Sequence, residues 1–142
     1  MKIYADTSFL ISLYSPDANS VAAAGAMRSS TGNHYITVFG ELEVVNAIGL
    51  RVFRKELSSS QAQSSLKDFE SDVHNGVFQL QPLSDQVFER ARQLSRQTTA
   101  RLGTGTADLL HVAAALELGM DCLFTFDLQQ RKLAQAVRLK LN

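Results

Sequence analysis

The chain has 142 residues, a length that fits one domain with a well-buried core. Hydrophobic residues make up 45% and charged residues 20% of it, a composition typical of globular domains rather than of disordered chains or repeat arrays. Fourteen Lys and Arg balance fourteen Asp and Glu, which argues against a broad phosphate-binding face but permits a local basic rim such as residues 51–55.

Short apolar runs alternate with longer helical patterns from the start of the chain. Residues 2–5 predict a strand, and residues 7–14 predict a helix directly after it. The Ala-rich residues 18–29 predict a second helix, for which Asp17 would be the N-cap. The β-branched residues 35–38 predict the next strand. This half of the chain therefore has the strand–helix alternation of an α/β protein.

The same alternation continues to the C-terminus. Apolar residues at near-helical spacing predict a helix over residues 40–55, and Leu42 and Val45 are expected to point into the core. Further helices are expected at 59–75, 84–98, 106–118 and 128–136, and further strands at 77–80, 123–126 and 137–139. The predicted fold is a single α/β domain spanning residues 1–142, with a central parallel β-sheet flanked by α-helices.

The sequence gives no indication of a membrane or secreted protein. Its longest apolar stretch, residues 109–116, is interrupted by His111 and is far shorter than the roughly 20 residues of a membrane span. The chain opens on a strand pattern without the basic and apolar regions of a signal peptide. The single cysteine, Cys122, cannot form an internal disulfide. We therefore expect a cytoplasmic protein.

Two aspartates each close a predicted strand and precede a predicted helix: Asp6 follows residues 2–5, and Asp127 follows residues 123–126. Ligands of open parallel sheets bind beyond the carboxyl ends of the strands, so both carboxylates would emerge at one edge of the sheet. Each aspartate could instead be a simple N-cap, since aspartate is among the commonest residues at helix starts. The repetition of the pattern favours a functional site.

Two further acids stand early in predicted helices, Glu43 after the second strand and Asp108 at the start of residues 106–118. All four carboxylates could therefore converge. Two unit charges about 5 Å apart repel by about 3 kcal/mol at an effective dielectric constant of 20, a cost that a divalent cation removes. Oxygen ligands fit Mg²⁺ or Mn²⁺ better than zinc, and such ions can activate water for displacement at a phosphodiester. Glu41 competes with Glu43 for the second position, and the helical period leaves this choice open.

Smaller polar residues near the acids are candidates to hold a ligand or a water molecule. They are Ser8, Asn46 and Thr125. Asn46 lies three residues after Glu43 and so shares its helix face, although a plain surface position is the favoured explanation. His111 lies one turn after Asp108 and invites a metal-binding or general-base role. Its apolar neighbours favour a packing role instead.

Four short segments surround the acids: residues 3–8 (IYADTS), 43–48 (EVVNAI), 106–115 (TADLLHVAAA) and 123–127 (LFTFD). In this order they resemble the motifs of PIN-domain nucleases, most closely the VapC-type toxins of bacterial toxin–antitoxin pairs. The resemblance implies a Mg²⁺- or Mn²⁺-dependent endoribonuclease that cleaves RNA with a metal-activated water, forms a homodimer and is inhibited by a cognate antitoxin. It assigns catalysis and metal binding to the four acids, and it favours Glu43 over Glu41. Gly105 departs from the pattern, which expects a larger, often basic residue there.

Two other classes of protein remain as alternatives. A PIN-like interaction module without turnover would share the fold, and only an assay separates it from a nuclease. A phosphoacceptor receiver-type signalling domain also carries acids at the carboxyl ends of its strands, but it needs a pair of them after the first strand and a Lys at the end of the last. Asp6 stands alone here, and Lys140 comes too late.

Overall fold

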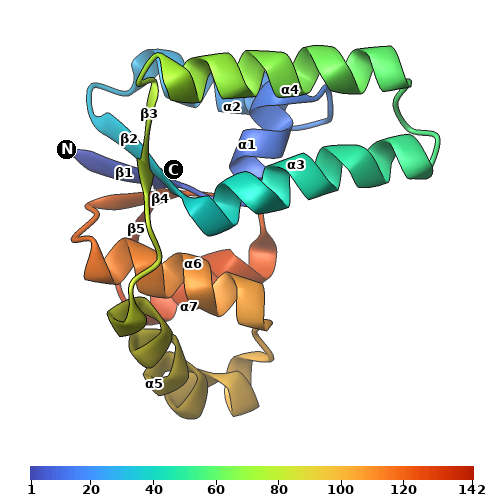
Figure 1. Cartoon of the computed structure of the whole chain (residues 1–142). Coiled ribbons are helices and arrows are strands. Elements are labelled where there is room, and N and C mark those ends of the chain that lie inside the picture. Colours follow the sequence, from blue (N-terminus) through green and yellow to red (C-terminus); the bar gives the residue numbers. More distant parts are fainter.

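The computed structural model describes residues 1–142 and places a five-stranded, fully parallel sheet between two layers of helices (Figure 1). The strands are β1 (Lys2–Ala5), β2 (Asn33–Thr37), β3 (Phe78–Gln81), β4 (Cys122–Phe124) and β5 (Lys140–Leu141). The helices are α1 (Thr7–Tyr14), α2 (Ser20–Ser29), α3 (Val38–Phe53), α4 (Ser59–His74), α5 (Asp85–Leu102), α6 (Thr106–Glu117) and α7 (Leu128–Ala136). None of them has both the length and the hydropathy that crossing a bilayer requires. The predicted α/β fold with a central parallel sheet is confirmed.

The strand order, β3-β2-β1-β4-β5, reverses its direction of growth at β1. The chain leaves β1 toward β2 and β3 on one side and later crosses to β4 and β5 on the other. Such a reversal opens a crevice at the carboxyl ends of the central strands, where α/β proteins bind ligands. Asp6 directly follows β1, and Asp127 comes three residues after the end of β4, the strand beside it; the Asp6 backbone N–H donates to the Phe124 carbonyl at 3.1 Å.

The two faces of the sheet bury two separate apolar cores. Ile3 and Ala5 of β1 pack with the layer formed by α1 to α4, whereas Tyr4 packs with the layer formed by α5 to α7. This follows from the pleat of a strand, which sends successive side chains to opposite faces. Among the buried residues of β1, Tyr4 is the one whose side chain carries a polar group. Because Tyr4 is fully buried, its hydroxyl needs a hydrogen-bond partner inside the protein.

The buried face of α3 differs from the predicted one. Val44 and Ile48 are buried, whereas Leu42 is 64% and Val45 38% exposed. Leu42 and Val44 are roughly 200° apart around the helix axis and so lie on nearly opposite faces. Each of them begins a row of apolar residues with helical spacing. The expectation that Leu42 and Val45 point into the core was wrong, because contacts with the rest of the fold, not the period, select the buried stripe.

Several predicted element ends are displaced by local hydrogen bonds and backbone turns. α3 already begins at Val38, which was assigned to the strand, because the Thr37 hydroxyl caps the helix by accepting from Gly40 N–H. The last strand lies at Lys140–Leu141 instead of 137–139, since the chain turns at Arg138, where φ is 60°. Asp17 is not the N-cap of α2. Its carboxylate accepts from the Asn19 N–H and the Ser12 hydroxyl, at 2.8 Å each, and α2 begins after Asn19.

Candidate active site

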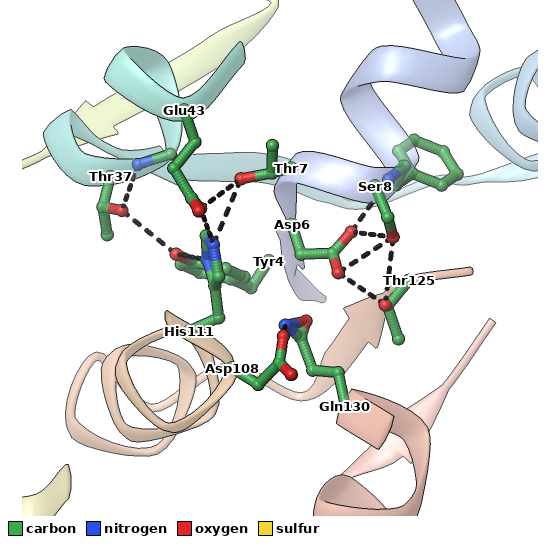
Figure 2. Close-up of polar contacts among 12 residues, drawn as sticks. Tyr4, Asp6, Thr7, Ser8, Thr37, Glu43, Asp108, His111, Thr125 and Gln130 are labelled. Carbon is green, nitrogen blue, oxygen red and sulfur yellow. Dashed lines mark hydrogen bonds and ion pairs between the residues drawn. The ribbon is translucent and has the colours of Figure 1, made fainter. Parts of the chain in front are cut away.

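The four acids singled out in the sequence line one cavity of about 210 Å³ at the carboxyl edge of the sheet. Asp6 follows β1, Glu43 lies in α3, Asp108 lies in the first turn of α6, and Asp127 follows β4. The remaining wall residues are Thr7, Ser8, Ile11, His111 and Gln130. In Figure 2, Asp6 lies between the group of Glu43, Thr7 and His111 on one side and Ser8 and Thr125 on the other. The topology thus brings together carboxylates that are far apart in the sequence.

Asp6 is the most deeply buried of the four acids, with 1% of its surface exposed. Its carboxylate accepts hydrogen bonds from the Ser8 hydroxyl at 2.8 and 3.0 Å, from the Phe9 N–H at 2.8 Å and from the Thr125 hydroxyl. Burial raises the pKa of Asp6 above its usual range, and these hydrogen bonds together with His111 oppose that shift. Asp6 is therefore a rigid part of the cavity floor.

Asp6 and Asp127 are both cavity residues and N-caps. Asp6 accepts from the N–H of Phe9 at the start of α1, and Asp127 accepts from the N–H of Gln130, at 2.9 Å, at the start of α7. The capping interpretation and the site interpretation of these residues are therefore compatible. The unpaired N–H groups at each helix start also favour a negative charge there, which helps to hold two carboxylates in one place.

Glu43 is held by two side chains from other elements. Its Oε1 accepts from the Thr7 hydroxyl at 2.6 Å and lies 2.5 Å from Nε2 of His111. Partial burial acts to raise the pKa of Glu43, but the hydrogen bonds from His111 and Thr7 outweigh it and hold this pKa below its usual range. Glu43 is therefore ionised at neutral pH.

Asp108 carries the clearest sign of electrostatic repulsion in the cavity. Burial, followed by the negative charges of Asp127 and Asp6, raises the pKa of Asp108 to about 6. Gln130, which is 1% exposed, donates from Nε2 to the carboxylate of Asp108 at 3.3 Å, whereas its own Oε1 has no hydrogen-bond partner. Buried polar oxygens normally have a hydrogen-bond partner. This part of the wall therefore has an unused acceptor beside the carboxylate whose pKa is raised.

The donor set of the cavity fits a hard divalent cation. Its available ligands are carboxylate and amide oxygens, which suit Mg²⁺ or Mn²⁺, and a bound cation would offset both causes of the raised pKa of Asp108, its burial and the neighbouring negative charges. As the side chains stand, no three of the Asp, Glu, His and Cys residues surround a single ion position. Asp6 and Glu43 are engaged in hydrogen bonds, so an ion here needs water ligands or a turn of the Asp108 and Asp127 side chains.

The smaller candidates differ in where the fold places them. Ser8 and Thr125 both donate to Asp6 and lie 3.3 Å from each other, so a residue after β4 supports the acid after β1. Asn46 is exposed on α3 and does not line the cavity, and Glu41 does not line it either. The geometry thus distinguishes Glu43 from Glu41, which the helical period could not do.

Gln130 and Tyr4 are among the residues of the site that were not singled out in the sequence. Gln130 is the third residue after Asp127, the position from which a helix N–H reaches its cap, and that spacing was its only signal. The Tyr4 hydroxyl reaches His111 from the strand that precedes Asp6. No local pattern indicates this contact, because it joins residues 107 positions apart.

Comparison with known proteins agrees with this geometry. The profile of the PIN domain family matches residues 3–136. The fold is similar to that of VapC20 of Mycobacterium tuberculosis, described as a sarcin–ricin loop cleaving toxin, with a TM-score of 0.70 and 17% identity over 92% of this chain and 93% of that one. It is also similar to VapBC-1 of nontypeable Haemophilus influenzae, with a TM-score of 0.68 and 16% identity over 100% of this chain and 97% of that one. A toxin–antitoxin complex of Klebsiella pneumoniae is similar as well, with a TM-score of 0.63 and 18% identity over 88% of this chain and 86% of that one. A search of curated protein sequences finds no match.

Proposed function

Because the chain belongs to the PIN domain family, we propose that it is a metal-dependent endoribonuclease and the toxin of a bacterial toxin–antitoxin pair. The observation that carries this proposal is the convergence of Asp6, Glu43, Asp108 and Asp127 on one cavity. An interaction module without turnover would have no reason to gather four carboxylates against their mutual repulsion. Hydrolysis of phosphodiester bonds gives that arrangement a use.

The four acids of the cavity would have two different roles in such a reaction. Asp6 and Glu43 are fixed by hydrogen bonds and would define the position of a bound ion. Asp108 and Asp127 are less constrained and would hold water molecules in line with the scissile phosphate. Mg²⁺ or Mn²⁺, when bound, would supply the Lewis-acid chemistry of the site by activating water and stabilising the leaving oxygen.

A second cavity, of about 300 Å³, gives the RNA strand a path away from the acids. It shares Ser8, Ile11 and Asp127 with the acidic cavity and is bordered by Arg51 and Phe126. Arg51 is paired with Asp17 of the same cavity at 3.3 Å, so an RNA phosphate that binds Arg51 would compete with the Asp17 carboxylate. RNA as the substrate also agrees with the activity described for the structurally similar VapC20.

We expect RNA cleavage products with a 5′-phosphate and a 3′-hydroxyl, because water, rather than the ribose 2′-hydroxyl, is the proposed nucleophile. Cleavage should stop in excess EDTA and return when Mg²⁺ or Mn²⁺ is added. End-group analysis of the cleaved RNA measures the first expectation, and single-turnover assays with and without chelator measure the second. A 2′,3′-cyclic phosphate, or full activity in EDTA, would contradict the mechanism.

The partners of the proposed toxin are a cognate antitoxin and a second copy of the chain. The antitoxin is supported by the similarity of the fold to the Klebsiella pneumoniae toxin–antitoxin complex. The second copy is supported by an apolar stripe along the outer face of α3, whose exposed members are Val38, Leu42, Val45 and Phe53. Exposed apolar side chains in a row commonly mark a protein interface.

We expect the purified protein to be a dimer at micromolar concentration, with an interface of about 1,000 Å² or more. Light scattering coupled to size-exclusion chromatography measures its mass against the 15.6 kDa of one chain. Leu42→Glu, which places a charge in the exposed stripe, should shift the mass toward that of a monomer. Val21→Glu on α2, where the side chain is 83% exposed against 64% for Leu42, is the matched control. A wild-type protein that elutes as a monomer would contradict the expected dimer.

A further inference from the structure

We propose that Tyr4 and His111 are positioning residues that fix the carboxylate of Glu43 through a directed chain of hydrogen bonds. The inference rests on the proposed function, because it concerns the orientation of one acid of the same cavity. It adds two residues on the Glu43 side of the group drawn in Figure 2: Tyr4 from the central strand and His111 from α6. Glu43 itself belongs to a third element, α3.

The chain consists of four side chains in direct contact. Nδ1 of His111 lies 2.8 Å from the Tyr4 hydroxyl, and Nε2 lies 2.5 Å from Oε1 of Glu43. The Tyr4 hydroxyl also lies 3.1 Å from Oγ1 of Thr37, the residue that caps the helix carrying Glu43. Tyr4 is fully buried and His111 is 3% exposed, so water does not compete for these contacts. Both ring nitrogens of His111 are therefore occupied by specific partners.

The contacts allow one consistent direction along the chain. Oε1 of Glu43 accepts from Thr7, and a carboxylate oxygen can only accept, so Nε2 of His111 carries the hydrogen that lies between them. In this tautomer Nδ1 is an acceptor, and the Tyr4 hydroxyl can donate to it. Thr37 accepts from the Gly40 N–H and can in turn donate to the Tyr4 oxygen. With these directions every member has a donor or acceptor for its neighbour.

Packing holds the imidazole ring in the plane that this chain requires. The ring of His111 lies edge-on to Tyr4, with centroids 5.7 Å apart, and is tilted against Phe39 with centroids 5.4 Å apart. Glu43 has three rotatable side-chain bonds, and only two contacts, from Thr7 and His111, restrain its carboxylate. Loss of the His111 contact should therefore let the carboxylate leave the position in which it serves the reaction. Residues that orient the acids of a metal site typically change activity about ten- to a hundredfold when replaced.

The first test replaces one hydroxyl. Tyr4→Phe keeps the ring in the core but removes the donor to Nδ1, and we expect kcat for RNA cleavage to fall about tenfold with little change in KM. Tyr14→Phe is the matched control, since Tyr14 donates a short hydrogen bond to Asp72 at 2.5 Å, outside the acidic cavity. Both variants lose one hydrogen-bonded tyrosine hydroxyl, so a purely structural effect would appear in both.

The second test varies the donor to Glu43. His111→Gln retains an N–H group that can reach toward the carboxylate, whereas His111→Leu fills similar space without one. We expect His111→Leu to lose about a hundredfold in kcat and His111→Gln to recover part of that loss. Equal activity of the Gln and Leu variants would show that the hydrogen bond to Glu43 has no effect on the reaction, and would overturn the positioning role.

A spectroscopic readout separates this inference from the proposed function. Long-range ¹H–¹⁵N correlation spectra report which ring nitrogen of a histidine carries a hydrogen, and the chain has only three histidines to assign. We expect a hydrogen on Nε2 of His111 and a shift of its Nδ1 resonance in Tyr4→Phe but not in Tyr14→Phe. An unprotonated Nε2, or an unchanged Nδ1 resonance, would overturn the inference even if the protein cleaves RNA. Absence of RNA cleavage by the wild type, with the expected spectra, would instead count against the proposed function.

Discussion

Replacing any one of the four acids by its amide should lower kcat for RNA cleavage by about a hundredfold or more, because supporting residues alone already cost ten- to a hundredfold. The variants are Asp6→Asn, Glu43→Gln, Asp108→Asn and Asp127→Asn. Each keeps the shape of the side chain and removes a charge that the proposed cation needs. Cleavage of a short RNA under single-turnover conditions measures the loss.

Glu41→Gln is the matched control for this series, since Glu41 lies two residues before Glu43 on α3 but outside the cavity. It should retain full activity. Asparagine is as good an N-cap as aspartate, so Asp6→Asn and Asp127→Asn should keep α1 and α7 intact. In a bacterial host the wild type should arrest growth and Asp6→Asn should not, and co-expression of the cognate antitoxin should relieve the arrest. An inactive Glu41→Gln beside an active Glu43→Gln would reverse the assignment.

The second large effect expected is a divalent-specific gain in stability. An ion that binds only the folded state with a dissociation constant of about 1 mM stabilises it by about 1.4 kcal/mol at 10 mM. For a chain of this length that corresponds to a rise in Tm of about 3–6 °C. NaCl at matched ionic strength should do much less, because it screens all surface charges instead of binding at the acidic cavity. Thermal unfolding with Mg²⁺, Mn²⁺ or NaCl measures the difference.

Asp108→Asn should behave in the opposite way from a simple destabilising substitution. The pKa of Asp108 is raised to about 6 in the folded protein, so its ionised form destabilises the fold above that pH, and this cost disappears as the pH falls toward 4. Without metal at pH 7.5 the variant should therefore be more stable than wild type, by about 1 kcal/mol after allowance for solvent screening at this half-buried site. It should also gain less from Mg²⁺.

Measurements at two pH values provide the control for this prediction. At pH 4.5 the Asp108 carboxyl is largely protonated in the folded protein, and the difference between wild type and Asp108→Asn should become small. Two results together would show that the acids do not share one electrostatic site. These are a Tm of Asp108→Asn below that of the wild type in EDTA at pH 7.5, and no divalent-specific shift in the Tm of the wild type at about 50 mM ion.

Local patterns in the sequence were enough to predict the fold class and the two aspartates that follow central strands. Every predicted helix and the first four predicted strands are present, because the alternation of a strand and the turn of a helix determine the spacing of apolar residues along the chain. Asp6 and Asp127 could be assigned to one edge because the end of a strand is itself a local feature, and parallel strands share their carboxyl edge. The predicted start of α3 and the predicted position of the last strand were wrong, since a single cap and a single turn decide them.

Only the tertiary structure decided the features that depend on contacts between distant residues. The strand order puts β4 beside β1 and so brings Thr125 to Asp6, a contact across 119 positions. The rotation of α3 turns Glu43 rather than Glu41 into the cavity, although both acids fit the helical period. The contact of Tyr4 with His111 likewise requires α6 to pack against the face of β1 that carries Tyr4. Spacing along the chain determines which face of an element a residue occupies, whereas the packing of that element against others determines what the residue meets.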